Sequence, residues 1–234
     1  MSLKKTILPF ILFLITINIS AQEAQDTIKR DLGYFNYLKV YNGIRVTLEQ
    51  SDVSEIHITG KKKHEVMFKN ISGKLKISMK FPKTFNSKDV DVLIKYKSEI
   101  EIIDSNEKSV VTVLDTIQQN GIELKTQEGA VIKTEEVIVK RLRVKAISGG
   151  EVKIKGGSTD NQIVDVGIGS VYKGYHIPSK QATVTSSSSS LAEITVEDFL
   201  DAEVRMGGSI NYRGEPTTVK TNKILGGTIN KMDE

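Results

Sequence analysis

The sequence predicts an all-β protein, a single-stranded parallel β-helix with rungs of about 20 residues. Three observations lead to this fold class. Apolar and polar residues alternate with a period of two from Tyr34 onward, as they do in half-buried strands. The stretch that comes nearest to a helical pattern, residues 28–38, is interrupted by Gly33. The second half of the chain repeats every 20 residues without a gap, which is typical of stacked solenoid rungs.

The composition limits both the size of the fold and its chemistry. The 234 residues, 38% of them hydrophobic, suffice for one domain with a core. The absence of cysteine excludes disulfides, thiolate-bound zinc, iron–sulfur clusters, a cysteine nucleophile and a lipoprotein anchor. No two of the three histidines have the spacing of metal ligands: His57, His64 and His176. We therefore expect no metal and no other cofactor.

Residues 1–21 are predicted to be a signal peptide. Lys4 and Lys5 precede an apolar run over residues 7–19, and Ala21 offers a cleavage site. Cleavage would remove two of the 33 basic residues and none of the 29 acidic ones, so the formal charge would fall from +4 to +2. No second apolar stretch of membrane length follows. We expect an exported protein, in the periplasm or at the cell surface, that does not insert into a membrane once the signal peptide is removed.

Residues 22–234 should form a single domain that begins with a less regular β region at 30–105. Alternating stretches predict short strands in this region, and we expect them to cap one end of the solenoid. The apolar residues expected to be buried against the first rung, near Val110, are Val40, Ile44 and Val46.

Regular rungs are expected over residues 106–232. Written in rows of 20, the chain places apolar residues in one column: Leu124, Val144, Val164, Val184, Val204 and Ile224. Six residues further on, small residues that fit a narrow interior share a column: Ala130, Gly150, Ser170 and Ser190. Eight residues on, the column reads Ile132, Val152, Tyr172, Ala192 and Tyr212. A β-sandwich is the alternative, because half of this period is the turn spacing of sandwiches.

The serine run 186–190 has the composition of a flexible linker. It lies inside one row of the repeat, however, and alternating residues flank it on both sides. We therefore expect a tight turn with a stacked serine interior and no domain boundary.

Two segments at opposite ends of the predicted domain resemble one family. Residues 35–50, FNYLKVYNGIRVTLEQ, are similar to its opening pattern F-x-x-I-x-V-x-G-x-x-V-x-L-x-Q, and residues 207–216, GGSINYRGEP, match its closing pattern G-G-S-I-x-Y-x-G-x-P. Both are typical of the head GIN domain family, exported bacterial proteins named as auto-transporter adhesins. The resemblance covers roughly residues 30–232. It implies a right-handed parallel β-helix with an adhesin-like role, and it brings no catalytic residue.

The closing motif also has a physical interpretation. Its glycines would allow positive φ at rung corners, and its proline would preset the turn after the strand. Its tyrosine would extend the column of Tyr172. We expect the motif residues to be structural and not a binding site: Gly207, Gly208, Ser209, Tyr212, Gly214 and Pro216.

No catalytic residue is predicted. Polysaccharide-cleaving enzymes of this architecture need clustered carboxylates, usually with a basic partner. The candidate carboxylates flank two turns: Asp160, Asp165, Asp198 and Asp201. Because acids and bases alternate on any solvated face, this pattern does not distinguish an active site from ordinary surface charge.

We therefore expect an exported, non-catalytic, adhesin-like binding module that recognises a cell-surface glycan or an envelope protein. The residues expected to contact sugar are Tyr172, Tyr175 and His176. Two alternatives stay open: a polysaccharide lyase or hydrolase, and a purely structural envelope scaffold.

Two further expectations concern partners. Nucleic acid is not an expected partner, because the one tight basic run is residues 61–63. The last rung, residues 224–229, should be either blunted by the charged tail at 231–234 or covered by a second copy in a homodimer.

Overall fold

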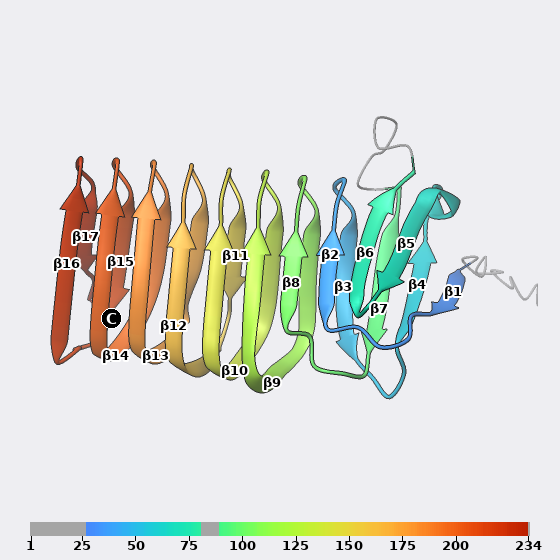
Figure 1. Ribbon diagram of the computed structural model, residues 1–234, viewed down its shortest axis with the longest axis horizontal. Helices are drawn as coiled ribbons and strands as arrows, with labels where there is room; N and C mark the ends of the chain where they lie inside the picture. The colour runs from blue at the N-terminus through green and yellow to red at the C-terminus, as the bar shows by residue number, and fades with distance from the viewer. Residues whose placement is uncertain (1–26, 81–88, 234) are drawn as a thin grey trace, which may run out of the picture.

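The computed structural model describes residues 27–80 and 89–233. These residues form a β-solenoid of about six turns, in which all 17 described strands join one continuous sheet. Figure 1 shows the rungs stacked along one axis, from the N-terminal strands at one end to β16 and β17 at the other. None of the residues described belongs to a helix long and apolar enough to cross a membrane. The predicted fold class is confirmed, whereas the signal peptide expected at 1–21 lies outside the described residues.

The elements follow one another with short connections. The N-terminal elements are β1 (Ile28–Asp31), β2 (Tyr37–Val40), β3 (Arg45–Gln50), β4 (Glu55–Thr59), the 3₁₀-helix η1 (Lys63–Glu65), β5 (Val66–Ile71), β6 (Lys74–Met79), β7 (Asp91–Tyr96) and β8 (Ile102–Ser105). The rungs that follow contain β9 (Val110–Thr126), β10 (Val131–Ala146), β11 (Glu151–Ile154), β12 (Gly157–Val166), β13 (Val171–Ser187), β14 (Leu191–Arg205), β15 (Ser209–Arg213), β16 (Thr218–Ile224) and β17 (Thr228–Lys231).

The long strands pair in parallel, as the 20-residue repeat predicts. Val144 of β10 lies between Leu124 of β9 and Val164 of β12, and all three side chains are buried in the core. Residues 142–146 run parallel to residues 162–166. The β-sandwich is therefore excluded, because its neighbouring strands are antiparallel.

Each rung has one tight turn whose two central residues have positive φ. The pairs are Asn42 and Gly43, Glu107 and Lys108, Glu128 and Gly129, Ser148 and Gly149, Ile168 and Gly169, Ser188 and Ser189, Met206 and Gly207, and Leu225 and Gly226. The serine run is thus a tight turn without glycine. In its interior the Ser190 hydroxyl donates to the Val166 carbonyl at 2.9 Å and lies 2.9 Å from Ser186 Oγ. The stacked small interior is confirmed and is longer than predicted: Ser109, Ala130, Gly150, Ser170, Ser190 and Gly208 are all buried.

The fixed 20-residue period fails in the last rungs, contrary to the prediction. Val184 of β13 pairs with Ala202 of β14 and not with Val204. The register shifts between Gly174 and Gln181, where β13 takes two more residues around its corner than β14 does. The last rungs are shorter for this reason.

The shift moves two residues out of their predicted columns. Tyr212 pairs with Ile194 and so does not extend the column of Tyr172. Ile224 pairs with Arg205 and is 42% exposed, so it does not continue the buried column.

Rungs begin earlier in the chain than predicted. Strands β2 and β3 pair in parallel with β8 and β9, so residues 37–50 already form a rung against residues 102–113. The antiparallel strands β1, β4 and β5 lie beyond this rung at the N-terminal end (Figure 1). The expected burial of Val40, Ile44 and Val46 is confirmed.

The opposite end of the solenoid is an open edge. All seven residues of β16 are exposed, and Leu225 in the next turn is 81% exposed. Lys223 pairs with the buried Val204 and therefore occupies an inward position of the last rung. A charge at an inward position of an edge strand opposes the addition of a further strand.

Candidate functional site

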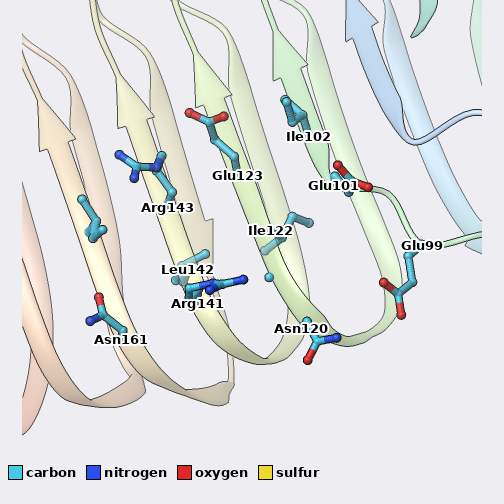
Figure 2. Close-up of a pocket in the computed structure, with 12 residues that line it drawn as sticks. Glu99, Glu101, Ile102, Asn120, Ile122, Glu123, Arg141, Leu142, Arg143 and Asn161 are labelled. Atoms are coloured by element: carbon cyan, nitrogen blue, oxygen red, sulfur yellow. The ribbon is translucent and has the colours of Figure 1, made fainter. Parts of the chain in front are cut away.

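A groove of about 500 Å³ is lined mainly by polar side chains. It lies on the face formed by residues 102–105, 121–126, 141–146 and 161–166, which we call the groove face. Figure 2 shows its side chains rising from neighbouring rungs. Since parallel strands lie about 4.8 Å apart, the groove spans several rungs.

Gly121 is the reason for the hollow. It pairs with Arg141 at an outward position of β9, between two rungs whose outward side chains are large. A Cβ atom on Gly121 would lie 3.2 Å from the Arg141 carbonyl oxygen. Beneath it, Ile122 and Leu142 are buried in the core. The floor is therefore bare backbone on a rigid, well-packed support.

Carboxylates line one side of the groove. Glu99 and Glu101 precede β8, and Glu123 projects from β9 (Figure 2). Glu101 accepts a hydrogen bond from the Asn36 amide at 3.0 Å, and Glu123 lies 3.8 Å from the Lys125 ammonium. These contacts orient the carboxylates of Glu101 and Glu123, and both keep free acceptor positions for a ligand.

Guanidinium groups line the other side. Arg141 and Arg143 extend from alternate positions of β10, and the Asn161 amide extends from β12 (Figure 2). Both arginines are exposed. The groove thus offers hydrogen-bond acceptors on one wall and donors on the other, an arrangement suited to a ligand rich in hydroxyl groups.

A smaller hollow of about 230 Å³ continues the groove face toward the tight turns. Its buried carboxylate, Asp104, lies 3.1 Å from the Lys39 ammonium, accepts from the Tyr37 hydroxyl at 2.9 Å and accepts from the Asn106 amide at 2.8 Å. Lys125 and Lys145 complete the lining.

Two side chains of this hollow, Tyr37 and Lys39, have raised pKa values. Burial, together with the hydrogen bond to Asp104, raises the pKa of Tyr37 to about 12. Burial acts to lower the pKa of Lys39, but its contacts with Tyr41 and Asp104 outweigh burial and raise this pKa above its usual range. Both groups keep their protons at neutral pH, so neither the Tyr37 phenol nor the Lys39 ammonium acts as a base there.

The three residues expected to contact sugar do not form one surface. Tyr172 is fully buried, because residues in its column point inward, and the expectation that it contacts a ligand is wrong. Tyr175 and His176 lie at the corner of β13, where Tyr175 is half-buried and His176 is exposed. The Arg213 guanidinium stacks 4.3 Å from the Tyr175 ring centroid, which covers one face of that ring.

The closing motif combines two different roles for glycine. Gly207 and Gly214 have positive φ, +76° and +98°, as predicted. Gly208 does not. It is required for close packing instead, because a Cβ atom there would lie 2.4 Å from the Ser186 carbonyl oxygen.

The other motif residues contact neighbouring rungs. The Ser209 backbone amide donates to Ser186 Oγ at 3.1 Å, and Tyr212 packs against the core. Pro216 follows the corner that begins at Gly214.

The candidate catalytic carboxylates do not meet. Asp160 forms an ion pair with Lys180 at 2.8 Å, and this contact lowers the pKa of Asp160. Asp165 lies between Lys145 and Thr185 on the groove face, and neither of these in-register neighbours is an acid. The residues described contain no group of three or more acidic or histidine side chains that could hold a metal ion.

The groove was missed by sequence reasoning, although two signals were present. Gly121 follows Asn120 in a dipeptide typical of a turn, yet alternating residues continue on its C-terminal side as in a strand. The sequence RLRVK at 141–145 places three cations on one face of a strand. Both features mark the same surface only after the register of β9 and β10 is known.

A family model described as "Putative auto-transporter adhesin, head GIN domain" matches residues 34–216. The chain belongs to the head GIN domain family. The resemblance inferred from the opening and closing motifs is confirmed, and both motifs lie within the matched segment.

Solved structures share this architecture along nearly the whole chain. A "putative adhesin" from Bacteroides fragilis superposes with a TM-score of 0.82 at 17% identity and covers 90% of this chain and 98% of its own. A "putative adhesin" from Parabacteroides distasonis gives 0.69 at 18% identity, covering 89% and 97%. A "putative lipid binding protein" from the same species gives 0.67 at 17% identity, covering 91% and 98%. At these identities the likeness establishes the fold. No curated protein matches the chain.

Proposed function

We propose that this head GIN domain protein is an exported, adhesin-like binding module that holds a cell-surface glycan in the groove over Gly121. The observation that carries the proposal is the groove itself, a bare backbone floor between carboxylates and arginines. Sugar hydroxyls donate to carboxylates and accept from guanidinium and amide groups, so a glycan can satisfy both walls. The adhesin names of the family and of its structural relatives agree with this role.

Export is part of the same proposal. The predicted signal peptide at 1–21 and the adhesin name of the family both favour a periplasmic or surface location. An envelope protein as the ligand is the nearest alternative, and a pull-down from envelope extracts with the groove variant below separates the two.

A catalytic role receives no support from the carboxylates. A general acid needs a pKa raised toward the working pH, whereas the Lys180 ion pair moves the pKa of Asp160 down. The lyase alternative predicts that the purified protein shortens acidic polysaccharides and that Asp165→Asn abolishes this activity. We expect no cleavage.

Storage of a lipid inside the solenoid is also disfavoured. One structural neighbour is named as a lipid-binding protein, which raises the question of whether the interior has room for an acyl chain. The cavity bounded by Leu48, Tyr96 and Ile117 has a volume of about 10 Å³, which does not admit an acyl chain.

The proposal is tested by binding the purified chain to a glycan array, with Gly121→Leu as the key variant. The leucine side chain would fill the groove from its floor, and we expect binding to fall by about tenfold or more. Thr183→Leu is the matched control, because Thr183 is an exposed outward residue of the same face, three rungs from Gly121. Equal binding by all three proteins would contradict the groove. An empty array and an empty pull-down would favour the structural scaffold.

A further inference from the structure

The groove face carries a row of three cations on one strand. Arg141, Arg143 and Lys145 occupy successive outward positions of β10, and all three are exposed. Alternate residues of a strand are about 6.7 Å apart, so the row extends over about 13 Å. It begins beside Gly121 and ends in the smaller hollow.

Among the described residues the three cations of the row form no ion pair, although Glu123 lies opposite Arg143 and Asp165 lies opposite Lys145 on the neighbouring rungs. Two cations elsewhere on the rungs do have an acidic partner. Lys173 lies 2.8 Å from Glu151, and Lys180 lies 2.8 Å from Asp160. Within residues 27–80 and 89–233, no ion pair is found for Arg141, Arg143 or Lys145. Rows of unpaired like charge lower stability unless something else neutralises them.

At one end of the row, the strand register places two lysines opposite each other. Lys145 pairs with Lys125 of β9, so two ammonium groups stand opposite each other on neighbouring rungs. Like charges directly opposite are destabilising in a sheet. Lys125 has Glu123 at 3.8 Å, whereas Lys145 forms no ion pair among the described residues and has Asp165 of β12 opposite it on the other neighbouring rung. An anionic group of a ligand in the smaller hollow would lie between the two lysines and remove this cost.

We infer that the glycan held in the groove is acidic, and that its carboxylate groups are bound by Arg141, Arg143 and Lys145 along β10. This inference rests on the proposed function and names the class of ligand. Guanidinium groups bind carboxylates through two parallel hydrogen bonds, which gives affinity and orientation together.

The opposite wall favours an acidic glycan over an acidic peptide. Glu99, Glu101 and Glu123 would repel a chain whose polar groups are mainly carboxylates. A uronate-containing glycan brings hydroxyl donors as well as carboxylates, so it can face acids on one side and cations on the other.

The test is a titration of the purified chain with sodium polygalacturonate and, in parallel, with the same polymer after reduction of its carboxyl groups. We expect polygalacturonate to bind and the reduced polymer to bind at least about tenfold more weakly. Affinity for polygalacturonate should fall as salt rises, since exposed charges are screened within about 8–10 Å. Poly-glutamate should bind no better than the reduced polymer.

The key variant replaces the row by Arg141→Gln, Arg143→Gln and Lys145→Gln together. The matched control, Lys133→Gln with Lys153→Gln and Lys173→Gln, removes the same charge from outward positions of three stacked rungs outside the groove face. We expect the first triple variant to lose about tenfold or more in affinity and the control to keep its affinity.

The outcomes separate this inference from the proposed function. Equal loss in both triple variants would show unspecific charge attraction and overturn the inference. If neutral glycans bind and Gly121→Leu blocks them, while polygalacturonate does not bind, the groove stands and only its acidic specificity is wrong. Binding of poly-glutamate as tight as that of polygalacturonate would assign the row to a peptide and also overturn the inference.

Discussion

The Tyr172 side chain lies directly over Gly174 in the solenoid interior: a Cβ atom at Gly174 would be 2.4 Å from the Tyr172 hydroxyl oxygen. Tyr172 is the largest fully buried side chain, and the space that it fills exists because the residue two positions later has no side chain. Val152 and Ala192 flank Tyr172 in the same column.

Gly174→Ala is therefore expected to destabilise the protein by about 1–3 kcal/mol, because the added methyl group overpacks the core. Denaturant unfolding measures the change. In a Tyr172→Val background the same substitution should cost much less. An equal cost in both backgrounds would show that the contact with Tyr172 is not the cause.

The two adjacent glycines of the closing motif should respond differently to alanine. Gly207→Ala places a side chain at φ +76° in open space and should cost about 1 kcal/mol. Gly208→Ala would push a methyl group against the Ser186 backbone, and we expect a loss of about 2–3 kcal/mol. Thermal unfolding of the two single variants compares them, and a larger loss for Gly207→Ala would contradict the packing role of Gly208.

We expect Lys223 to keep the protein monomeric by preventing association through the open edge at β16. Lys223→Val replaces the inward charge by an apolar side chain, and we expect this variant to associate through its last rung. Light scattering at high protein concentration measures the mass. Lys220→Val on the same strand is the control, since Lys220 pairs with the exposed Asp201 and points outward. A dimeric wild-type chain would instead support a second copy as the cover of this edge.

Alkaline pH should destabilise the fold in a defined window. Burial, and to a lesser degree the charge of Asp115, raises the pKa of Tyr96 from 10 to about 12. Because the folded state favours the protonated phenol, this group contributes its full stability below pH 10 and loses it progressively as the pH rises to 12. The melting temperature of Tyr96→Phe should therefore fall less between pH 10 and 12 than that of wild type. Tyr34→Phe, at a 62% exposed position, should behave as wild type.

Much of the fold could be predicted because each rung of a solenoid has the same pattern of inward and outward residues. The alternation of apolar residues determines which side chains point inward, and the spacing of Leu124, Val144 and Val164 determines which residues pair. The same logic predicted the turn at residues 186–190 and the buried small column. The same pattern predicts that Tyr172 points inward, so its interpretation as a sugar contact contradicted the repeat.

The errors arise where the chain leaves its repeat. The register after Gly174 depends on how many residues turn the corner toward Gln181, and corner length has no periodic signal. The rung at residues 37–50 was hidden because an antiparallel insertion separates it from its neighbour at 102–113.

The groove could not be predicted from the sequence of any single strand. Its floor comes from Gly121 on β9, and its walls come from β8, β10 and β12. Each residue looks ordinary in sequence, since a glycine and alternating arginines are compatible with any exposed strand. Only the pairing of Gly121 with Arg141 brings the missing side chain and the cations together.

The most direct test of the groove is amide hydrogen exchange of the full chain with and without the tightest-binding glycan from the array. We predict that added protection is confined to residues 99–104, 120–125, 141–145 and 161–163, which line the groove and the adjoining hollow. Protection at the Tyr175–His176 corner with none at Gly121 would contradict the account and assign binding to the other surface.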